Sequence, residues 1–132
     1  MSVHHARGAN AYRQTGVQSS SPLELVVMLY DGLLRHVVAA RNAHGRTDLA
    51  GRREAFSKAL AILTELQSTL NLAQGGEVAA SLDRLYTYMI ERLLDASARK
   101  DMGALDELEK LLRPLREAWA EIATPMAAGA RP

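Results

Sequence analysis

Residues 21 to 40 read SPLELVVMLYDGLLRHVVAA, and this stretch decides the class of fold. It opens with three helix-start signals in register. Ser21 suits the N-cap position, Pro22 suits the first helical position, and Glu24 can reach back to complete a capping box. These signals predict a helix over about 22–43. It should end near Gly45, because glycine readily takes the left-handed conformation that follows many helices.

The apolar surface of this first helix is wider than a bundle core requires. One arc of the helical wheel suits the core and holds Leu23, Val26, Val27, Tyr30, Leu33, Leu34 and Val37. Leu25, Met28, Leu29 and Gly32 fall outside the centre of that arc. Gly32 costs about 1 kcal/mol against alanine inside a helix, and close approach of another backbone would offset this cost. That backbone could belong to a neighbouring helix of the bundle or to a binding partner.

Three more amphipathic helices are predicted, over about 49–71, 77–99 and 102–123. The glycines of the Gln74-Gly75-Gly76 segment should separate the second helix from the third, and Asp101 should cap the fourth. Apolar residues recur at helical spacing in each. They are Ala55, Ala59, Ile62, Leu63, Leu66 and Leu70, then Leu82, Leu85, Tyr86, Met89 and Leu93, then Leu105, Leu108, Leu111, Leu112, Leu115, Trp119 and Ile122.

The predicted fold is an all-α, antiparallel up-down four-helix bundle. Strand patterns are missing, and short connections between long helices favour antiparallel neighbours. We expect a flexible N-terminal segment over 1–20, the bundle over 21–124 and a flexible tail over 125–132. Pro114 removes one backbone hydrogen bond but lies away from the leucine stripe, so a bend on the solvent side is expected.

The third helix also has apolar side chains to spare. Thr87, Tyr88, Ile90 and Leu94 lie beside or opposite its core stripe. Soluble monomers seldom expose contiguous apolar patches beyond a few hundred Å² without a partner. The sequence therefore predicts a partner, which could be a second copy of the chain, a segment of the chain itself or a foreign amphipathic helix.

Composition excludes several classes of function. The chain of 132 residues has no cysteine, which removes disulfides and thiolate chemistry. It has neither an uncharged apolar run of about 18 residues nor a signal peptide, so we expect a cytoplasmic protein without membrane insertion. A formal net charge of +1 gives no general reason to bind nucleic acid.

Catalytic and cofactor motifs are also missing from the sequence. No histidine follows a glutamate at the spacing of a di-iron bundle site, and no serine has a base in a recognisable motif. His36 lies at the margin of an apolar face, where a structural role is more common than metal binding. We therefore expect no enzyme activity, no catalytic residue, no metal and no cofactor.

Four segments together resemble the flagellar secretion chaperone FliS family. They are Ala11-Tyr12, SPLELVVMLYDGLL at 21–34, GGEVAASLDRLYTY at 75–88 and LREAW at 115–119. No one of these segments is decisive, but their order and spacing make a specific match over nearly all of the domain.

The resemblance implies an export chaperone that binds the C-terminal segment of flagellin and prevents its premature polymerisation. It further implies delivery to the flagellar type III export apparatus, through the export gate protein FlhA. The client-binding residues would be Tyr12, Leu25, Met28, Leu29, Gly32, Tyr88, Ile90 and Leu94. The free protein would be a monomer or weak dimer. The alternative is a dimeric structural or interaction bundle with no flagellin client.

The N-terminal segment suggests a further contact. Tyr12 lies in a stretch without a helical stripe, so it has no core position to fill. We expect residues 1–18 to cover part of the client groove in the free protein, with Tyr12 and Val17 as apolar contacts. The alternative is a tail without a fixed position, as is usual for chain ends.

Overall fold

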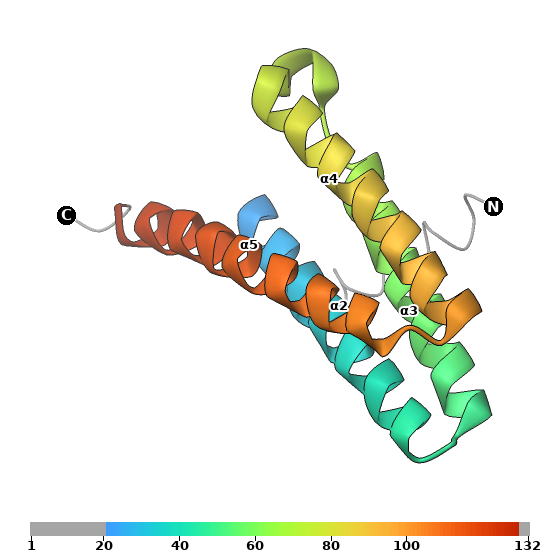
Figure 1. Cartoon of the computed structure of the whole chain (residues 1–132). Helices are drawn as coiled ribbons and strands as arrows, with labels where there is room; N and C mark the ends of the chain where they lie inside the picture. Colours follow the sequence, from blue (N-terminus) through green and yellow to red (C-terminus); the bar gives the residue numbers. More distant parts are fainter. Residues whose placement is uncertain (1–20, 130–132) are drawn as a thin grey trace, which may run out of the picture.

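The chain folds into four helices, as predicted. The computed structural model describes residues 21–129, except for the side chains of 72–74 and 124–129. The elements are α2 (Pro22–Gly45), α3 (Leu49–Ser68), α4 (Leu72–Arg99) and α5 (Met102–Gly129), shown in Figure 1. The described residues contain no strand, so the predicted all-α class is confirmed.

The helix starts follow the side chains that cap them. Ser21 Oγ accepts from the Glu24 backbone N–H at 3.2 Å, and Glu24 Oε1 accepts from the Ser21 N–H at 2.7 Å. Both halves of the predicted capping box are therefore present. At the start of α5, Asp101 Oδ1 accepts from the Ala104 N–H at 3.3 Å, as expected of an N-cap.

The left-handed residue after α2 is Thr47, so the prediction for Gly45 was wrong. The helix includes Gly45, and the Arg46 N–H still bonds to Asn42 O at 3.1 Å. Thr47 has a φ of 55°, which lets the Asp48 N–H bond to Ala43 O at 2.8 Å. The turn must present Asp48 as the cap of α3, and this places the left-handed residue two positions after the glycine.

Glycine interrupts α4 near its start. Gly76 has φ 58° and ψ −136°, a backbone conformation open to glycine but strained for other residues. Helix geometry begins before this point, at Leu72, and the Gly75 N–H bonds to Asn71 O at 2.7 Å. The predicted break over 74–76 is thus a kink at Gly76 inside α4. The predicted second helix ends at Ser68, earlier than expected.

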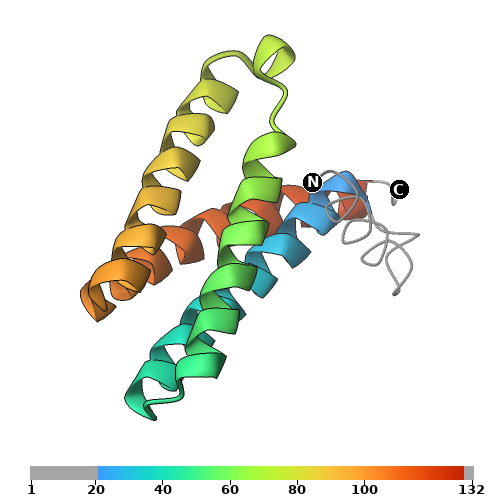
Figure 2. The same cartoon turned by 90° about the vertical axis from the view of Figure 1, so that its right-hand side faces the viewer.

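The four helices pack in a ring. α2 contacts α3 and α5, and α4 contacts the same two helices. Successive helices run in opposite directions, which gives the predicted bundle (Figure 1). Figures 1 and 2 both show α5 leaving its turn at a wide angle to α4, so that the first half of α4 and the second half of α5 diverge. The bundle is therefore open between α4 and α5 at the end opposite this turn.

The core is built from the predicted stripes, with one correction. Its largest fully buried side chains are Tyr30, Tyr86, Leu33, Leu63, Leu66, Met89, Leu93, Leu105, Leu108, Leu112 and Val37. Ile122 was expected at the end of the α5 stripe but is 48% exposed. It lies on the part of α5 that diverges from α4, where none of the other described helices covers it. Pro114 is exposed, and α5 runs through it.

Candidate functional site: an apolar patch between α4 and α5

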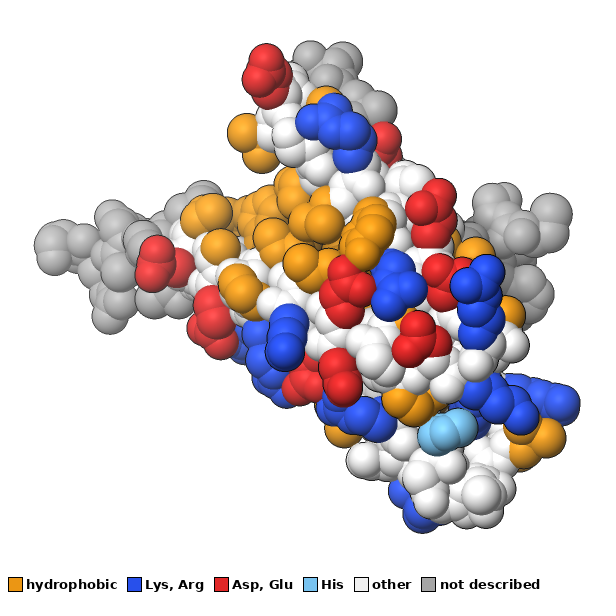
Figure 3. Space-filling view, viewed as in Figure 1, with side chains coloured by type: hydrophobic (Ala, Val, Ile, Leu, Met, Phe, Trp, Pro, Cys, Tyr) orange, Lys and Arg blue, Asp and Glu red, His pale blue; other side chains and the backbone are white. Residues whose placement is uncertain are grey.

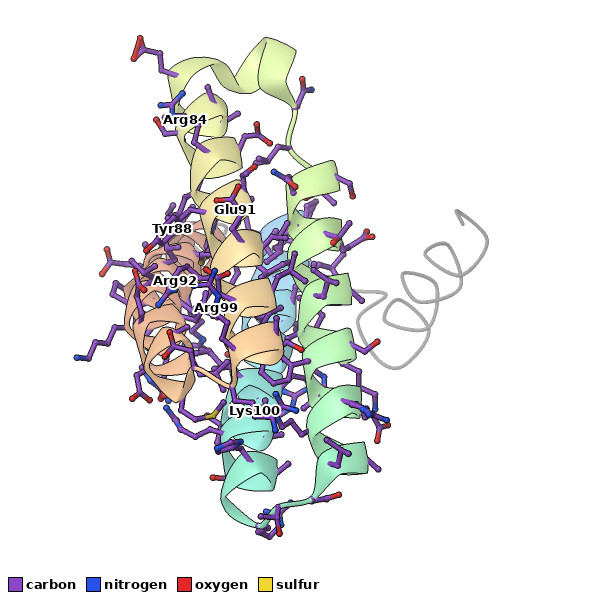
Figure 4. All side chains as sticks on the ribbon, turned by 45° about the vertical axis from the view of Figure 1, so that its right-hand side comes forward. Arg84, Tyr88, Glu91, Arg92, Arg99 and Lys100 are labelled. Atoms are coloured by element: carbon purple, nitrogen blue, oxygen red, sulfur yellow. The ribbon has the colours of Figure 1, made fainter. Side chains whose placement is uncertain are left out.

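A polar cluster defines the edges of α4 and α5 that face each other. The Tyr88 hydroxyl of α4 hydrogen-bonds to the Glu107 carboxylate of α5, and Arg92 Nε donates to the same carboxylate at 2.8 Å. Figure 4 shows Tyr88 and Arg92 on the side of α4 that faces α5. Leu85 and Val78 precede Tyr88 on this edge of α4 at helical spacing. The outer part of this edge is therefore apolar.

The matching edge of α5 begins at Glu107. Leu111, Leu115 and Ile122 follow it at helical spacing toward the open end of the bundle. We call six side chains on the two edges the α4–α5 patch: Val78, Leu85 and Tyr88 of α4, with Leu111, Leu115 and Ile122 of α5. Figure 3 shows apolar side chains gathered in the angle between these two helices.

The patch is substantially open to solvent. Val78 is 71% exposed, Ile122 48% and Tyr88 41%, while Leu85, Leu111 and Leu115 are half-buried. A soluble domain rarely leaves such a continuous apolar surface uncovered unless it binds something there. The arrangement suits an amphipathic helix or an extended apolar segment laid between α4 and α5.

A pair of buried tyrosines anchors α4 to α2. Tyr30 of α2 and Tyr86 of α4 share a hydrogen bond of 2.6 Å between their hydroxyl oxygens. Burial raises the pKa of both hydroxyls, so both stay protonated at neutral pH. Trp119 of α5 also acts on the Tyr30 hydroxyl and opposes this rise in its pKa. The Tyr30–Tyr86 hydrogen bond thus ties α2 directly to α4.

The inner end of the patch is closed by charge. Arg92 contacts Glu107, and it also lies 3.4 Å from Asp95 and 3.8 Å from Asp101. The hydrogen bond from Tyr88, with that from Arg92, lowers the pKa of Glu107. The same bond to Glu107 raises the pKa of Tyr88. An apolar segment bound between α4 and α5 would meet charged and hydrogen-bonding groups at this point. These groups limit how far the apolar part of the segment can extend toward the α4–α5 turn.

Within the described residues, the structure contains no recognisable metal cluster. No three His, Asp or Glu side chains of this region gather closely enough to hold an ion. None of the described helices combines the length and apolar character needed to cross a bilayer.

The predicted residues of α2 lie on a different edge of the bundle. Leu25, Met28 and Leu29 are half-buried, and Gly32 is buried. They share an edge with His36, whose pKa is lowered by burial and by the charge of Lys58 on α3. This edge therefore turns toward α3 and away from α5. The burial of Gly32 fits the alternative of close packing within the bundle.

The predicted residues of α4 divide between its two edges. Gln67 of α3 donates to Thr87 Oγ1 at 2.8 Å, which places that side of α4 against α3. Ile90 and Leu94 follow Thr87 on the same side, and Leu94 is 50% exposed. Tyr88 alone among the predicted residues of α4 belongs to the α4–α5 patch. The predicted contact at Tyr12 lies outside the described residues.

Sequence reasoning missed the contribution of α5. Leu111, Leu115 and Ile122 were assigned to the core because they repeat at core spacing. The only signal of a second role was that the apolar stripe of α5 is broad, and its width does not reveal the angle at which α5 leaves the turn. That angle is a tertiary feature, and it uncovers one side of the stripe.

The chain matches a known family over most of its length. The model of the family described as flagellar protein FliS covers residues 5–126. The chain belongs to the FliS family. FliS relatives include a flagellar secretion chaperone of Salmonella typhimurium, 41% identical over 125 residues, which are 91% of this chain and 93% of the relative. The resemblance inferred from the four sequence segments is thereby confirmed.

Two further FliS relatives agree with this assignment. A flagellar secretion chaperone of Escherichia coli is 36% identical over 124 residues, covering 90% of this chain and 91% of the relative. A flagellar secretion chaperone of Bacillus subtilis is 37% identical over 111 residues, which are 84% of this chain and 82% of the relative. The α4–α5 patch is therefore a feature of a bundle whose relatives are named as secretion chaperones.

Proposed function

We propose that this chain binds the C-terminal segment of flagellin in the cytosol and prevents its premature polymerisation. It then delivers the segment to the flagellar type III export apparatus. The observation that carries this proposal is the uncovered α4–α5 patch on a bundle of the FliS family. The proposed role requires binding and release, with no catalytic step, cofactor or metal.

The patch suits a client that is amphipathic and folds on binding. A disordered segment can wrap a large surface, and the cost of ordering it is subtracted from the contact energy. Exposed Ile122 and Val78 would contact the apolar face of the client at the open end. Tyr88 would contribute its ring while its hydroxyl stays bonded to Glu107. Modest affinity follows from this balance, and a chaperone must release its client.

Other parts of the client would reach the predicted residues outside the patch. Leu25, Met28 and Leu29 offer half-buried apolar atoms on α2, and Ile90 and Leu94 offer them on the α3-facing side of α4. A wrapped segment could contact several edges of so narrow a bundle in succession. By family resemblance, the loaded chaperone would then meet the export gate protein FlhA.

Direct titration with a flagellin C-terminal peptide tests the proposal. We expect a one-to-one complex by isothermal titration calorimetry and a gain of helical circular dichroism, since the free peptide would be disordered. Ile122→Lys should weaken binding by about tenfold or more, because a buried charge would replace an apolar contact. Absence of both heat and added helicity over a range of temperatures would refute the proposal.

A matched control comes from the opposite end of the bundle. Leu49 is 51% exposed, so Leu49→Lys makes the same chemical change at the same degree of exposure, far from the patch. We expect client affinity to be unchanged in this variant. Equal weakening by both substitutions would mean that the binding site is elsewhere.

The alternative of a dimeric bundle has a separate signature. The α4–α5 patch could be covered by a second copy of the chain, which light scattering without client would report as a stable dimer. Ile122→Lys would then give monomers. We expect a monomer or weak dimer in the free protein, and a tight dimer that excludes flagellin peptide would favour the alternative.

The N-terminal segment gives a second test of the client groove. We propose that residues 1–18 cover part of it in the free protein, with Tyr12 and Val17 in contact. Deleting these residues should leave the affinity for flagellin peptide unchanged or higher, and should make the free protein more prone to self-association. Loss of binding on deletion would show instead that this segment is part of the client site.

A further inference from the structure

The end of the bundle opposite the open angle carries a surplus of positive charge. The α2–α3 turn, the first turn of α3 and the end of α4 meet there. Figure 3 shows lysine and arginine side chains gathered at the lower right, and Figure 4 places Lys100 at this end. We call this surface the base patch: His44, Arg46, Asp48, Leu49, Arg52, Arg53 and Lys100. Arginine and lysine outnumber acidic side chains in this patch, whereas the whole chain has a net charge of only +1.

Arg52 is the unusual member of the base patch. It is only 7% exposed, and Phe56 lies under its guanidinium with 5.4 Å between charge centre and ring centroid. Its Nη2 donates to Ser97 O of α4 at 2.8 Å. In the described part of the chain its Nε–H has no acceptor, and no carboxylate lies within ion-pair distance. Buried charges in proteins are usually paired, so this guanidinium lacks a counter-ion.

A pocket of about 170 Å³ lies against this arginine. His44, Lys100 and Asp48 are among the side chains that line it. Asp48 is already engaged, since its Oδ1 accepts from the Gly51 N–H at 2.9 Å. The remaining charged groups of the lining, Arg52 and Lys100, are cations. The pocket therefore has the size and charge to admit one carboxylate.

Nearby carboxylates are occupied elsewhere. Glu54 pairs with Lys58 at 3.0 Å, and Asp101 caps α5 and lies 3.8 Å from Arg92. Within the base patch itself, Asp48 lies 3.8 Å from Arg46 and offsets that charge. Among the described residues, Arg52, Arg53 and Lys100 are left without a carboxylate partner. A ligand that supplies several negative charges would be attracted to this surface.

We propose that the base patch binds an acidic segment of a protein partner, with one carboxylate seated in the pocket between Arg52 and Lys100. The unpaired charge extends beyond the pocket to exposed Arg53, and Arg46 lies beside it in an exposed pair with Asp48, which favours several carboxylates over a single small anion. Exposed Leu49 adds an apolar contact at the pocket edge, which suits a peptide better than a nucleic acid. The site lies away from the α4–α5 patch, so it does not depend on the proposed client.

The backbone allows a clean test at Lys100. This residue has a φ of 56°, a conformation that glycine adopts without strain. Lys100→Gly thus removes a pocket cation while keeping the turn, and the melting temperature should be unchanged or higher. Arg84→Ala is the matched control, because Arg84 is an exposed cation at the other end of α4 (Figure 4).

The probe is a fluorescein-labelled octaglutamate peptide, followed by fluorescence anisotropy with the full-length protein. We expect binding at about 20 mM salt that weakens steeply by about 0.5 M. Lys100→Gly should weaken binding about tenfold, as expected for loss of a charged hydrogen bond, and Arg84→Ala should have no effect. In ¹⁵N spectra, the Arg52 Nε–H resonance should shift on addition of the peptide and exchange more slowly with water.

Several results would overturn the proposal. One is absence of peptide binding at low salt. Another is equal weakening by Lys100→Gly and Arg84→Ala, which would indicate attraction without a site. An unmoved Arg52 Nε–H resonance would exclude the pocket even if the peptide bound. Tighter binding of inorganic phosphate or of a single-stranded oligonucleotide would assign the base patch to another class of ligand.

Discussion

The buried tyrosine pair between α2 and α4 gives a prediction with a defined size. Tyr30 is fully buried and Tyr86 is 1% exposed, with 2.6 Å between their hydroxyl oxygens. Tyr86→Phe removes the partner of the Tyr30 hydroxyl, and Tyr30→Phe removes the partner of the Tyr86 hydroxyl. A buried polar group left unpaired costs about 1–3 kcal/mol, so each single change should lower the free energy of unfolding by that amount.

The double variant should behave differently from the sum of the single ones. With both hydroxyls absent, neither tyrosine position retains an unpaired donor or acceptor, and phenylalanine fills almost the same volume. We expect the double change to cost about as much as one single change, which corresponds to a coupling energy as large as one single effect, about 1–3 kcal/mol. Part of the remaining cost would come from Trp119, which also interacts with Tyr30.

Urea denaturation followed by circular dichroism measures this cycle. The wild type, the two single variants and the double variant should share the same slope of unfolding free energy against urea concentration. Differences in their urea midpoints then report differences in stability alone. Each kcal/mol should correspond to about 4 °C in melting temperature for a domain of this size. If the two single effects add to give the double effect within about 0.5 kcal/mol, the two hydroxyls do not depend on each other. That result would refute the reasoning from the Tyr30–Tyr86 hydrogen bond.

Three further changes test other parts of the structure. Leu66→Lys should unfold the domain, because it buries a charge in the core, whereas exposed Ile122→Lys should leave circular dichroism and melting temperature nearly unchanged. Thr47→Gly should stabilise by about 1 kcal/mol in urea melts, because Thr47 holds a φ of 55°, and a loss would mean that its side chain matters more than backbone strain. Burial and nearby positive charge lower the pKa of His36 in the folded protein, so the unfolded chain binds a proton at this residue more readily. Stability should therefore fall as the pH drops below about 6.5. In His36→Gln, the urea midpoint should change less between about pH 7.5 and 5.5 than it does in the wild type.

Local signals in the sequence predicted the helices and most of the core. The capping box at Ser21 and the N-cap at Asp101 depend on residues within one turn, so they can be recognised without tertiary information. The buried tyrosines were placed on core stripes, but their mutual contact joins residues far apart in the chain. Periodicity gives the face of a helix and does not give its neighbour.

The candidate site was only partly predictable for the same reason. Tyr88 was identified as a surplus apolar side chain, and it lies in the α4–α5 patch. Ile122 was assigned to the core, because only the angle between α4 and α5 leaves it exposed. Arg52 was not singled out, since a charge early in an amphipathic helix is normally solvated, and its burial depends on the end of α4.

The short α2–α3 and α4–α5 turns also bear on how quickly this protein folds after its synthesis. Residues 46–48 join α2 to α3, and residues 100–101 join α4 to α5, so each pair forms a hairpin of near neighbours in sequence. Helical bundles with such local contacts fold within about milliseconds, whereas a ribosome adds about 5–20 residues per second. Folding should therefore be complete almost as soon as the last helix leaves the ribosome. The supply of this protein to any partner would then be set by its synthesis and not by its folding.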